Sequence, residues 1–317
     1  MRIVILDGYT ANPGDLDWTG FSELGELTVY DRTSREDIIS RAKGYEIVIT
    51  NKTPMGKEEL DQLPDVKYIG LLSTGYNIVD LDTANERGIV VTNVPAYSTK
   101  SVAQLVFAYI LDFAIAASHH SDLVHNGRWS DCKDFCFWDK SIIELEGKTI
   151  GILGFGSIGR CVAKIAKAFD MNVIVYTRTV PDDKCGCEFV GVEELFKRSD
   201  FLSVHCPLTD ETKGIVNKEY LSLMKKNSYI INTSRGPVIN EEDLAFALNN
   251  DMISGAAMDV LSTEPPKKDN PLLTAKNCVI TPHLAWASRD ARKRLVEIAC
   301  ENLKGYLNGS IVNKVNK

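Results

Sequence analysis

Short apolar runs of four to six residues recur along the chain, and most are separated by amphipathic stretches of helical length. Strands with apolar residues at consecutive positions are typical of parallel sheets, which are buried on both faces. Strands that alternate with helices predict an α/β fold with helices covering those sheets. The expected strands are 2–6, 46–50, 67–72, 88–92, 149–153, 172–176, 200–204, 228–232 and 278–281, and helical patterns between them include 34–43, 56–63, 192–199 and 240–250.

One segment breaks this alternation. Residues 98–125 form a long helical pattern, with Ser98 or Thr99 as a plausible N-cap. An irregular segment follows at 127–148, so this region is a candidate crossover between two α/β domains. We expect its aromatic side chains to serve packing or an interface rather than a cofactor site; these are Trp129, Phe135, Phe137 and Trp138.

A glycine motif, GFGSIG at 154–159, follows the expected strand 149–153 and begins a helical pattern. That context is the one a dinucleotide-binding fingerprint requires, with glycines for a tight turn and close approach to a pyrophosphate. Backbone N–H groups around Ser157 and Ile158 would bind phosphate oxygens. The alternative is an ordinary strand–helix turn that contains Gly154, Gly156 and Gly159.

The next expected strand ends in Thr177 and Arg178, where NAD-binding proteins usually carry an acidic residue for the ribose hydroxyls. A carboxylate there repels a 2′-phosphate, whereas a hydroxyl and a guanidinium suit one. The cofactor is therefore NAD or NADP, with these residues leaning toward NADP or dual use. The other interpretation is that Arg178 is solvated or stacks on adenine while NAD is still accepted.

Composition limits the functions that are compatible with the chain. The 317 residues suffice for two domains, and the net charge of −7 argues against nucleic-acid or anionic-membrane partners. No segment reaches the ~20 apolar residues of a membrane span, and the apolar N-terminal run is too short for a signal peptide. The 8 scattered cysteines lack zinc-site spacing, so we expect no metal and a cytoplasmic location.

Two downstream residues suggest chemistry on their own. Arg235 follows the expected strand 228–232, and its guanidinium could bind a carboxylate with two parallel hydrogen bonds. His283 follows the strand 278–281, a position that suits an acid or base. A lone loop histidine can equally be structural.

The ordered motifs of the chain resemble those of the D-isomer-specific 2-hydroxyacid dehydrogenases, nearest to the glycerate dehydrogenase (hydroxypyruvate reductase) branch. The resemblance covers nearly the whole chain. It rests on STGYN, VPAYSTKSVAQ, GFGSIG, HCPLT, NTSRGPVIN, AMDVLSTEPP, DNPLL and TPHLAWAS, in that order.

The resemblance implies a catalytic trio of Arg235, Glu264 and His283. Arg235 would bind the carboxylate of a 2-oxoacid, and His283 would protonate the carbonyl oxygen as the nicotinamide delivers a hydride. Glu264 would hold the imidazole and favour its protonated form. In the reverse reaction, neutral His283 would remove the hydroxyl proton.

The resemblance also implies binding residues beyond the trio. Asp259, with the backbone of Thr233, would contact the nicotinamide carboxamide, and backbone N–H groups of the 73–75 loop would bind the substrate carboxylate. Trp286 would narrow the pocket toward small side chains. The implied cofactor residues are Gly154, Gly156, Ser157, Ile158, Gly159, Thr177, Arg178, His205, Cys206, Pro207, Thr212, Thr233 and Asp259, and the implied substrate residues are Ser73, Thr74, Gly75, Arg235, His283 and Trp286.

The implied fold has two Rossmann- or flavodoxin-like domains with parallel sheets and an active site in the interdomain cleft. Residues 1–98 and 285–317 would form the substrate-binding domain, and residues 99–284 the NAD(P)-binding domain. The family commonly dimerises through the helix and loop around 100–145, which would use the aromatic side chains there.

The resemblance leaves two functions open. The first is an NAD(P)-dependent dehydrogenase that interconverts a small 2-oxoacid of the hydroxypyruvate or glyoxylate type and its D-2-hydroxyacid. The second is a dinucleotide-sensing binding protein of the corepressor type, which shares the fold and the trio. The chain lacks the long disordered tails that such a scaffold would use, and this favours the enzyme.

Overall fold

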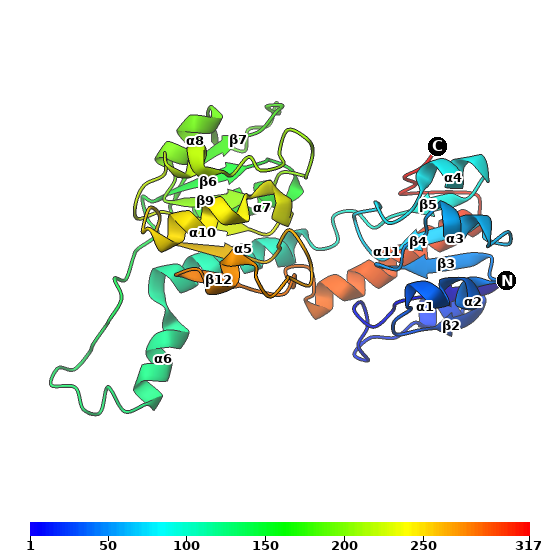
Figure 1. The fold of residues 1–317 in the computed structure, drawn as a ribbon, viewed down its shortest axis with the longest axis horizontal. Coiled ribbons are helices and arrows are strands. Elements are labelled where there is room, and N and C mark those ends of the chain that lie inside the picture. Colours follow the sequence, from blue (N-terminus) through cyan, green and yellow to red (C-terminus); the bar gives the residue numbers. More distant parts are fainter. The chain divides into compact units, whose positions relative to one another are not determined.

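The computed structural model describes residues 1–317, which divide into two compact units (Figure 1). Unit 1 comprises Met1–Ser98 and Trp286–Lys317, and unit 2 comprises Thr99–Ala285. Each unit contains one parallel sheet covered by helices, as the alternating pattern predicted.

The five strands of unit 1 form a parallel sheet in the order β2-β1-β3-β4-β5, the flavodoxin-like arrangement. Their bounds are β1 Arg2–Ile5, β2 Glu26–Val29, β3 Ile47–Thr50, β4 Tyr68–Leu71 and β5 Val90–Thr92. The helices are α1 Thr19–Ser22, α2 Ile38–Ala42, α3 Lys57–Asp61, α4 Leu81–Glu86 and α11 Arg289–Leu307, and a 3-10 turn spans Arg35–Asp37.

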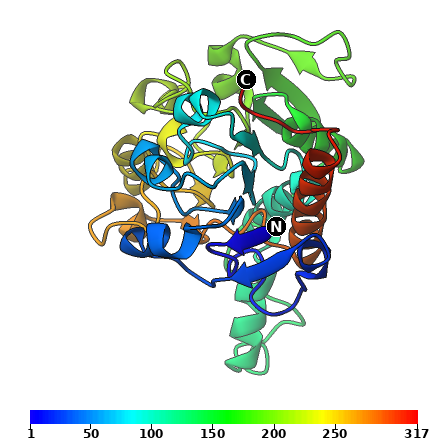
Figure 2. The same ribbon diagram turned by 90° about the vertical axis from the view of Figure 1, so that its right-hand side faces the viewer.

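Alternate side chains of the strands in unit 1 point to opposite faces of the sheet, so its core has two layers. Ile3 and Ile5 pack in one cluster with residues of α11, whereas Val4 packs in the other with residues of α2 and α4. Tyr68 of β4 lies against Tyr306 of α11, with ring centroids 4.9 Å apart. Helix α11, red in Figure 2, therefore covers one face of this sheet.

Unit 2 contains a seven-stranded parallel sheet in the order β12-β11-β10-β9-β6-β7-β8. Counted from β6, this is the Rossmann order 3-2-1-4-5-6 with one strand added, and its switch point lies between β6 and β9. The strands are β6 Thr149–Leu153, β7 Asn172–Tyr176, β8 Glu188–Phe189, β9 Phe201–Val204, β10 Tyr229–Asn232, β11 Gly255–Met258 and β12 Cys278–Ile280. The helices are α5 Thr99–Ile115, α6 Ala117–His125, α7 Ser157–Ala168, α8 Val192–Arg198, α9 Lys218–Leu221 and α10 Glu241–Asn249, with 3-10 turns at Gly236–Val238 and Pro271–Thr274.

Three strands were absent from the sequence-based prediction. Strand β11 has the sequence GAAM, which lacks the β-branched residues that mark its neighbours, although all four residues are buried between β10 and β12. Strand β2 lies at an edge of its sheet and is only partly buried, and β8 has two residues. Segments with such weak local signals form strands because they pair with neighbouring strands.

The prediction of a single long helix over 98–125 was wrong in one respect, because the structure has two helices there, α5 and α6. The break lies at Ala116, which has a left-handed φ of 50°. No single helix is long and apolar enough to cross a membrane, and only the bent α5–α6 pair reaches the required length and composition. Both views show α6 and the segment after it projecting from the body of unit 2 (Figures 1 and 2).

Candidate active site

The predicted trio lies on three neighbouring loops of unit 2. Strands β10, β11 and β12 are parallel and adjacent, with Asn232 paired to Met258 and Met258 to Ile280. Their carboxyl ends therefore meet at one edge of the sheet, where ligands bind in open α/β folds. The loops that follow carry Arg235, Glu264 and His283.

The loop after β10 is ordered by the fully buried side chain of Asn232. Its Oδ1 accepts hydrogen bonds from the backbone N–H and the hydroxyl of Ser234, both at 2.9 Å, and its Nδ2 donates to the Arg235 carbonyl at 3.0 Å. The exposed Arg235 side chain donates from Nη1 to the Ser234 carbonyl at 2.7 Å. Asn232 was not predicted as a site residue, although short polar residues after a strand are a known turn signal.

Gly236 allows the loops after β10 and β11 to lie in direct contact. A β-carbon at this position would collide with the backbone of Leu261 and Ser262. Since such a clash involves backbone atoms, no side chain could move to relieve it. The Gly236 position therefore keeps the loop of Arg235 beside the loop that carries Glu264.

His283 and Glu264 form a close pair. The imidazole Nδ1 lies 2.6 Å from Glu264 Oε2, and the side chains are 32% and 39% exposed respectively. The other carboxylate oxygen, Oε1, accepts a hydrogen bond from the Leu261 N–H at 3.1 Å. Because an ionised carboxylate only accepts hydrogen bonds, Nδ1 carries a proton and Nε2 is the nitrogen left to exchange protons with a ligand.

The loop that carries His283 is strained and firmly held. His283 has a left-handed φ of 52°, which is rare for a residue other than glycine. Its N–H donates to the Asp259 carbonyl at 2.8 Å, and the carboxylate of Asp259 accepts from Leu284 N–H at 2.8 Å and Ala285 N–H at 2.9 Å. Asp259 is 1% exposed, and burial raises the pKa of its carboxyl group.

The predicted phosphate-binding glycines have the geometry that a dinucleotide needs. Gly154 has a φ of 99°, and a β-carbon there would lie 2.5 Å from the backbone nitrogen of Cys206. Gly159 packs equally closely against the Gly154 carbonyl, which brings α7 tightly onto β6. A β-carbon at Gly156, by contrast, would meet only open space. The glycines therefore leave room for a pyrophosphate at the start of α7, where Ser157 and Ile158 present their N–H groups.

Thr233 gives a second indication that a polar ligand group fits this edge. It directly follows β10, its side chain is 8% exposed, and its Oγ1 has no hydrogen-bond partner in the protein. Buried polar groups are nearly always paired, so an orphaned hydroxyl at a ligand-binding edge is expected to meet a ligand. A carboxamide, which both donates and accepts hydrogen bonds, fits such a group.

The segment after β9 lies at the switch point of the sheet. Burial lowers the pKa of His205 to about 3, and its Nε2 lies 2.8 Å from the hydroxyl of Ser203. Burial also raises the pKa of the Cys206 thiol to about 11. Pro207 is exposed, and its carbonyl accepts a hydrogen bond of 2.5 Å from Thr212. The segment therefore presents neutral groups beside the glycine motif.

Thr177 and Arg178 follow β7 at the same edge of the sheet. Thr177 is partly buried, and Arg178 is exposed. The pKa of Glu211 lies below its usual value, chiefly because of a hydrogen bond from Thr209 and in small part because of the charge of Arg178. The guanidinium is therefore near enough to the 205–212 segment to affect Glu211 and is still available to an anion.

The implied substrate loop of unit 1 offers backbone groups. The Ser73 hydroxyl donates to the Gly75 carbonyl at 2.6 Å, and the Thr74 hydroxyl donates to the Val94 carbonyl at 2.8 Å. The backbone N–H groups of residues 73–75 donate to no other protein group. Trp286 belongs to the same unit and packs edge-on against Tyr97, with ring centroids 6.5 Å apart.

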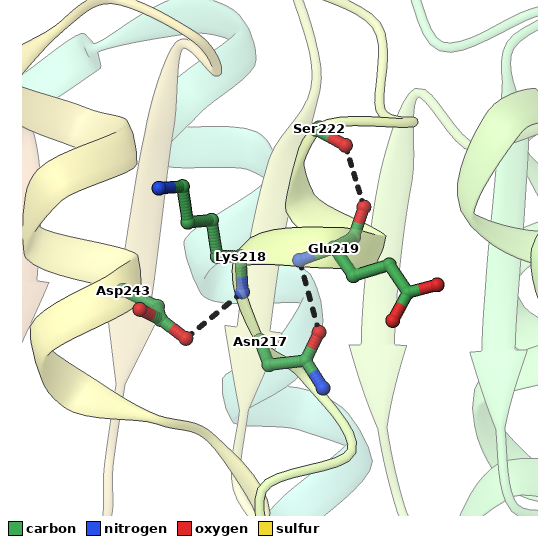
Figure 3. A pocket seen from close by; sticks show the side chains of 5 residues that line it. All are labelled: Asn217, Lys218, Glu219, Ser222 and Asp243. Atoms are coloured by element: carbon green, nitrogen blue, oxygen red, sulfur yellow. Dashed lines mark hydrogen bonds between the residues drawn. The ribbon is translucent and has the colours of Figure 1, made fainter.

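A hollow on unit 2 lies outside this set of residues (Figure 3). It is lined by α9 and α10, where Asn217 and Asp243 accept hydrogen bonds from the backbone N–H groups of Glu219 and Lys218. These carboxylate and amide oxygens stabilise the start of the short helix α9. The hollow is therefore explained by local structure and adds nothing to the candidate site.

Comparison with known protein families identifies relatives of this chain. The family model described as "D-isomer specific 2-hydroxyacid dehydrogenase, NAD binding domain" matches residues 107–285. A hydroxypyruvate reductase of Blautia hydrogenotrophica is 50% identical, with 100% of both chains covered. A glycerate dehydrogenase of Methylorubrum extorquens is 36% identical, with 92% of both chains covered.

Solved structures show the same architecture. One of them is an acyclic imino acid reductase in complex with NADPH and D-Arg, which is 33% identical to this chain. The alignment covers 99% of this chain and 100% of that one, with a TM-score of 0.85. The similarity therefore extends over both units and not only over the glycine motif.

Proposed function

The chain belongs to the D-isomer-specific 2-hydroxyacid dehydrogenase family, and we propose that its substrates are hydroxypyruvate or glyoxylate and the corresponding D-glycerate or glycolate. It is an oxidoreductase that acts on the CH–OH group of a small 2-hydroxyacid with a nicotinamide dinucleotide as cofactor. The choice of substrates is supported by relatives named hydroxypyruvate reductase and glyoxylate reductase. It is also supported by the 67–77 segment, which contains no arginine for a phosphorylated substrate.

The close contact between His283 and Glu264 is the observation that carries the proposal. With Nδ1 donating to a carboxylate at 2.6 Å, Nε2 of His283 is free to protonate the carbonyl oxygen of a 2-oxoacid. The negative charge of Glu264 stabilises the imidazolium that must give up this proton. In the oxidative direction, neutral His283 accepts the hydroxyl proton at the same nitrogen.

Arg235 is proposed to bind the substrate carboxylate. Its exposed guanidinium lies on a loop that Asn232 orders and that Gly236 holds against the loop of Glu264. A planar guanidinium can donate two parallel hydrogen bonds to a carboxylate and thereby fix the orientation of the neighbouring carbonyl. We also propose that the N–H groups of Ser73, Thr74 and Gly75, which donate to no other protein group, bind the substrate carboxylate.

The cofactor-binding roles rest on the fit of the groups described above. Gly154, Gly156 and Gly159 with the N–H groups of Ser157 and Ile158 would hold the pyrophosphate. The orphaned hydroxyl of Thr233 would contact the carboxamide together with Asp259. The segment with His205, Cys206, Pro207 and Thr212 would line the adenosine side. The nicotinamide supplies the hydride that reduces the carbonyl carbon.

A substrate panel tests the proposed function. The purified protein is assayed with NADH and NADPH against hydroxypyruvate, glyoxylate, pyruvate and 3-phosphohydroxypyruvate. We expect turnover to be fastest with hydroxypyruvate or glyoxylate. If a folded protein that binds cofactor turned over none of these compounds, the dinucleotide-sensing alternative would replace the enzyme. Preferred turnover of a different oxoacid would contradict the proposed substrate alone.

We propose that the cofactor site accepts NADPH, either preferentially or together with NADH. Arg178 is exposed, and Thr177 and Arg178 directly follow β7, where a carboxylate would repel a 2′-phosphate. We expect Arg178→Ala to lower kcat/KM for NADPH about tenfold, corresponding to the loss of one charge-assisted hydrogen bond, and to change that for NADH less than threefold. A wild-type preference for NADH above tenfold would contradict the proposal.

We propose a homodimer that forms through α5, α6 and the segment up to residue 145. Trp129, Phe135 and Trp138 in this segment are 51%, 88% and 62% exposed, which is unusual for large aromatic side chains. Burial of such side chains is a common source of interface stability. Light scattering after gel filtration should give a dimer for the wild type and a monomer for a Phe135→Ser/Trp138→Ser variant.

We propose the cytoplasm as the location of the protein. Its cysteine residues are all free, and scattered thiols of this kind persist in reducing compartments. Fractionation of source cells followed by immunodetection tests this placement, and recovery in a membrane or extracellular fraction would contradict it.

A further inference from the structure

The loop at residues 281–285 is held mainly by one buried side chain. Asp259 accepts hydrogen bonds from the Thr281 hydroxyl at 2.5 Å, from Leu284 N–H at 2.8 Å and from Ala285 N–H at 2.9 Å. His283 itself donates to the backbone carbonyl of the same residue. The left-handed φ of His283 therefore persists because its neighbours on both sides are fixed.

Helix α5 contacts this loop at both ends. The hydroxyl of Tyr109 forms a hydrogen bond with the hydroxyl of Thr281, which lies two residues before His283. The hydroxyl of Ser101, two turns earlier on α5, donates to the Ala285 carbonyl at 2.6 Å, two residues after His283. Both contacts involve side chains of a helix that carries none of the predicted site residues.

Donor and acceptor can be assigned for each hydrogen bond that links Tyr109, Thr281 and Asp259. The Thr281 hydroxyl has a single proton, and it donates this proton to the Asp259 carboxylate. Thr281 therefore accepts from Tyr109, which donates its phenolic proton. Tyr109 is 4% exposed, so it has no solvent to replace this partner. The chain runs from Tyr109 through Thr281 to Asp259, and each group is paired.

We propose that Tyr109 and Ser101 are positioning residues that clamp the His283 loop to α5 and so place the imidazole for proton transfer. This inference rests on the proposed role of His283 and adds two residues that are not among the predicted site residues. The reason is geometric. Proton transfer requires the imidazole within hydrogen-bond reach of the substrate oxygen, and small displacements of a catalytic group have large effects on rate.

The structure provides a matched control in unit 1. Tyr68 is fully buried and its hydroxyl forms a 2.6 Å hydrogen bond with the hydroxyl of Thr92. Tyr68→Phe therefore removes the same kind of buried tyrosine–threonine contact as Tyr109→Phe, but at a place without a link to His283. Any effect that comes only from loss of a buried hydrogen bond will appear in both variants.

The test compares kinetics and stability of these variants with the preferred 2-oxoacid. We expect Tyr109→Phe to lower kcat about fivefold to tenfold while KM for the cofactor changes less than twofold. Tyr68→Phe should lower Tm by a similar amount and leave kcat within twofold of the wild type. Equal kcat for Tyr109→Phe and wild type, with the same loss of Tm as Tyr68→Phe, would overturn the proposal.

Substitutions at Thr281 distinguish the hydrogen-bond chain from simple packing. Thr281→Val preserves shape and removes the hydroxyl, whereas Thr281→Ser keeps the hydroxyl and removes a methyl group. We expect Thr281→Val to lower kcat about tenfold and Thr281→Ser to retain at least half of it. The reverse order would show that packing, and not the Tyr109–Thr281–Asp259 chain, positions the loop.

A spectroscopic measurement separates failure of the clamp from failure of the proposed function. The chain has 5 histidines, so the imidazole signals of His283 can be assigned by NMR through their absence in His283→Ala. Tyr109→Phe should shift or broaden them in the protein without cofactor, and Tyr68→Phe should not. Unchanged signals would refute the clamp. Changed signals in a protein without turnover of any oxoacid would support the clamp and refute the proposed function.

Discussion

His205 follows β9 and His283 follows β12, so both histidines leave the same carboxyl edge of one parallel sheet. The surroundings of the two rings differ. His205 is partly exposed, desolvation of its ring lowers its pKa to about 3, and its ring partner is the hydroxyl of Ser203. His283 is 32% exposed and its Nδ1 lies against the carboxylate of Glu264.

This difference separates two functions of the same side chain. A carboxylate partner allows an imidazole to take up and release a proton, whereas desolvation without a charged partner keeps it neutral. His205 is therefore suited to hydrogen bonding beside the glycine motif, and His283 to acid–base chemistry. Sequence position at the end of a strand does not distinguish the two residues.

The largest expected effect is that of His283→Ala. Loss of a general acid or base costs about 10²- to 10⁴-fold in rate, so we expect kcat to fall about a thousandfold. Affinity for the cofactor, measured by fluorescence titration, should stay within threefold of the wild type. Residual kcat above one tenth, or an equal loss of cofactor affinity, would mean that His283 is structural.

Glu264→Gln makes the surroundings of His283 resemble those of His205, since it replaces a charged partner with a neutral one. We expect kcat for reduction to fall about 10- to 100-fold, because the imidazolium loses its stabilising charge. KM for the oxoacid should change less than threefold, because Glu264 contacts the imidazole. Residual kcat above half of the wild-type value would show that the charge of Glu264 is not needed.

Arg235→Lys tests whether substrate binding can be separated from proton transfer. A lysine keeps the charge but cannot donate two parallel hydrogen bonds, so we expect kcat/KM for the oxoacid to fall about 30-fold. Most of this loss should appear as a higher KM for the oxoacid, whereas Glu264→Gln should mainly lower kcat. Steady-state kinetics at one pH provide the measurement. An unchanged KM would contradict the proposed role of Arg235 in binding the carboxylate.

His205→Gln has the smallest expected effect on catalysis, with kcat within about threefold of the wild type. Its effect on stability depends on pH. Above the usual pKa of 6.5, the His205 imidazole is neutral in both the folded and the unfolded chain, so its contribution to the free energy of unfolding is fully present. As the pH falls below 6.5, His205 becomes protonated in the unfolded chain, whereas in the folded chain it stays neutral until about pH 3. The free energy of unfolding therefore decreases as the pH falls.

Thermal unfolding at different pH values measures this contribution. A one-unit fall below the usual pKa lowers the free energy of unfolding by about 1 kcal/mol, or about 3 °C in Tm. The wild type should therefore lose about 3 °C more than His205→Gln between pH 7.5 and 5.5. Parallel pH dependence in the two proteins would show that His205 takes up a proton in the folded state.

Much of this protein could be predicted from local sequence. Apolar runs such as 149–153 and 172–176 predicted strands of a parallel sheet, because a strand buried on both faces needs apolar residues at consecutive positions. The glycines of 154–159 predicted a tight turn before a helix, and Gly154 does have a positive φ. Arg235, Glu264 and His283 were predicted from short motifs, and the structure places the imidazole of His283 against the carboxylate of Glu264.

Other features were decided only by tertiary structure. The GAAM sequence becomes β11 because β10 and β12 pair with it on either side, and the helical pattern over 98–125 breaks at Ala116 without a proline or glycine to predict it. Nothing local marks His205 as neutral. That state arises from burial by residues distant in sequence.

The contacts of Tyr109 and Ser101 with the His283 loop show most clearly what local sequence does not predict. In the sequence, Tyr109 occupies an ordinary apolar position of a helix, 172 residues from Thr281. Its hydroxyl acquires a role only because folding places α5 beside the loop that follows β12. Local sequence thus determined which residues can carry the chemistry, whereas long-range packing determined which protonation states and positions they adopt.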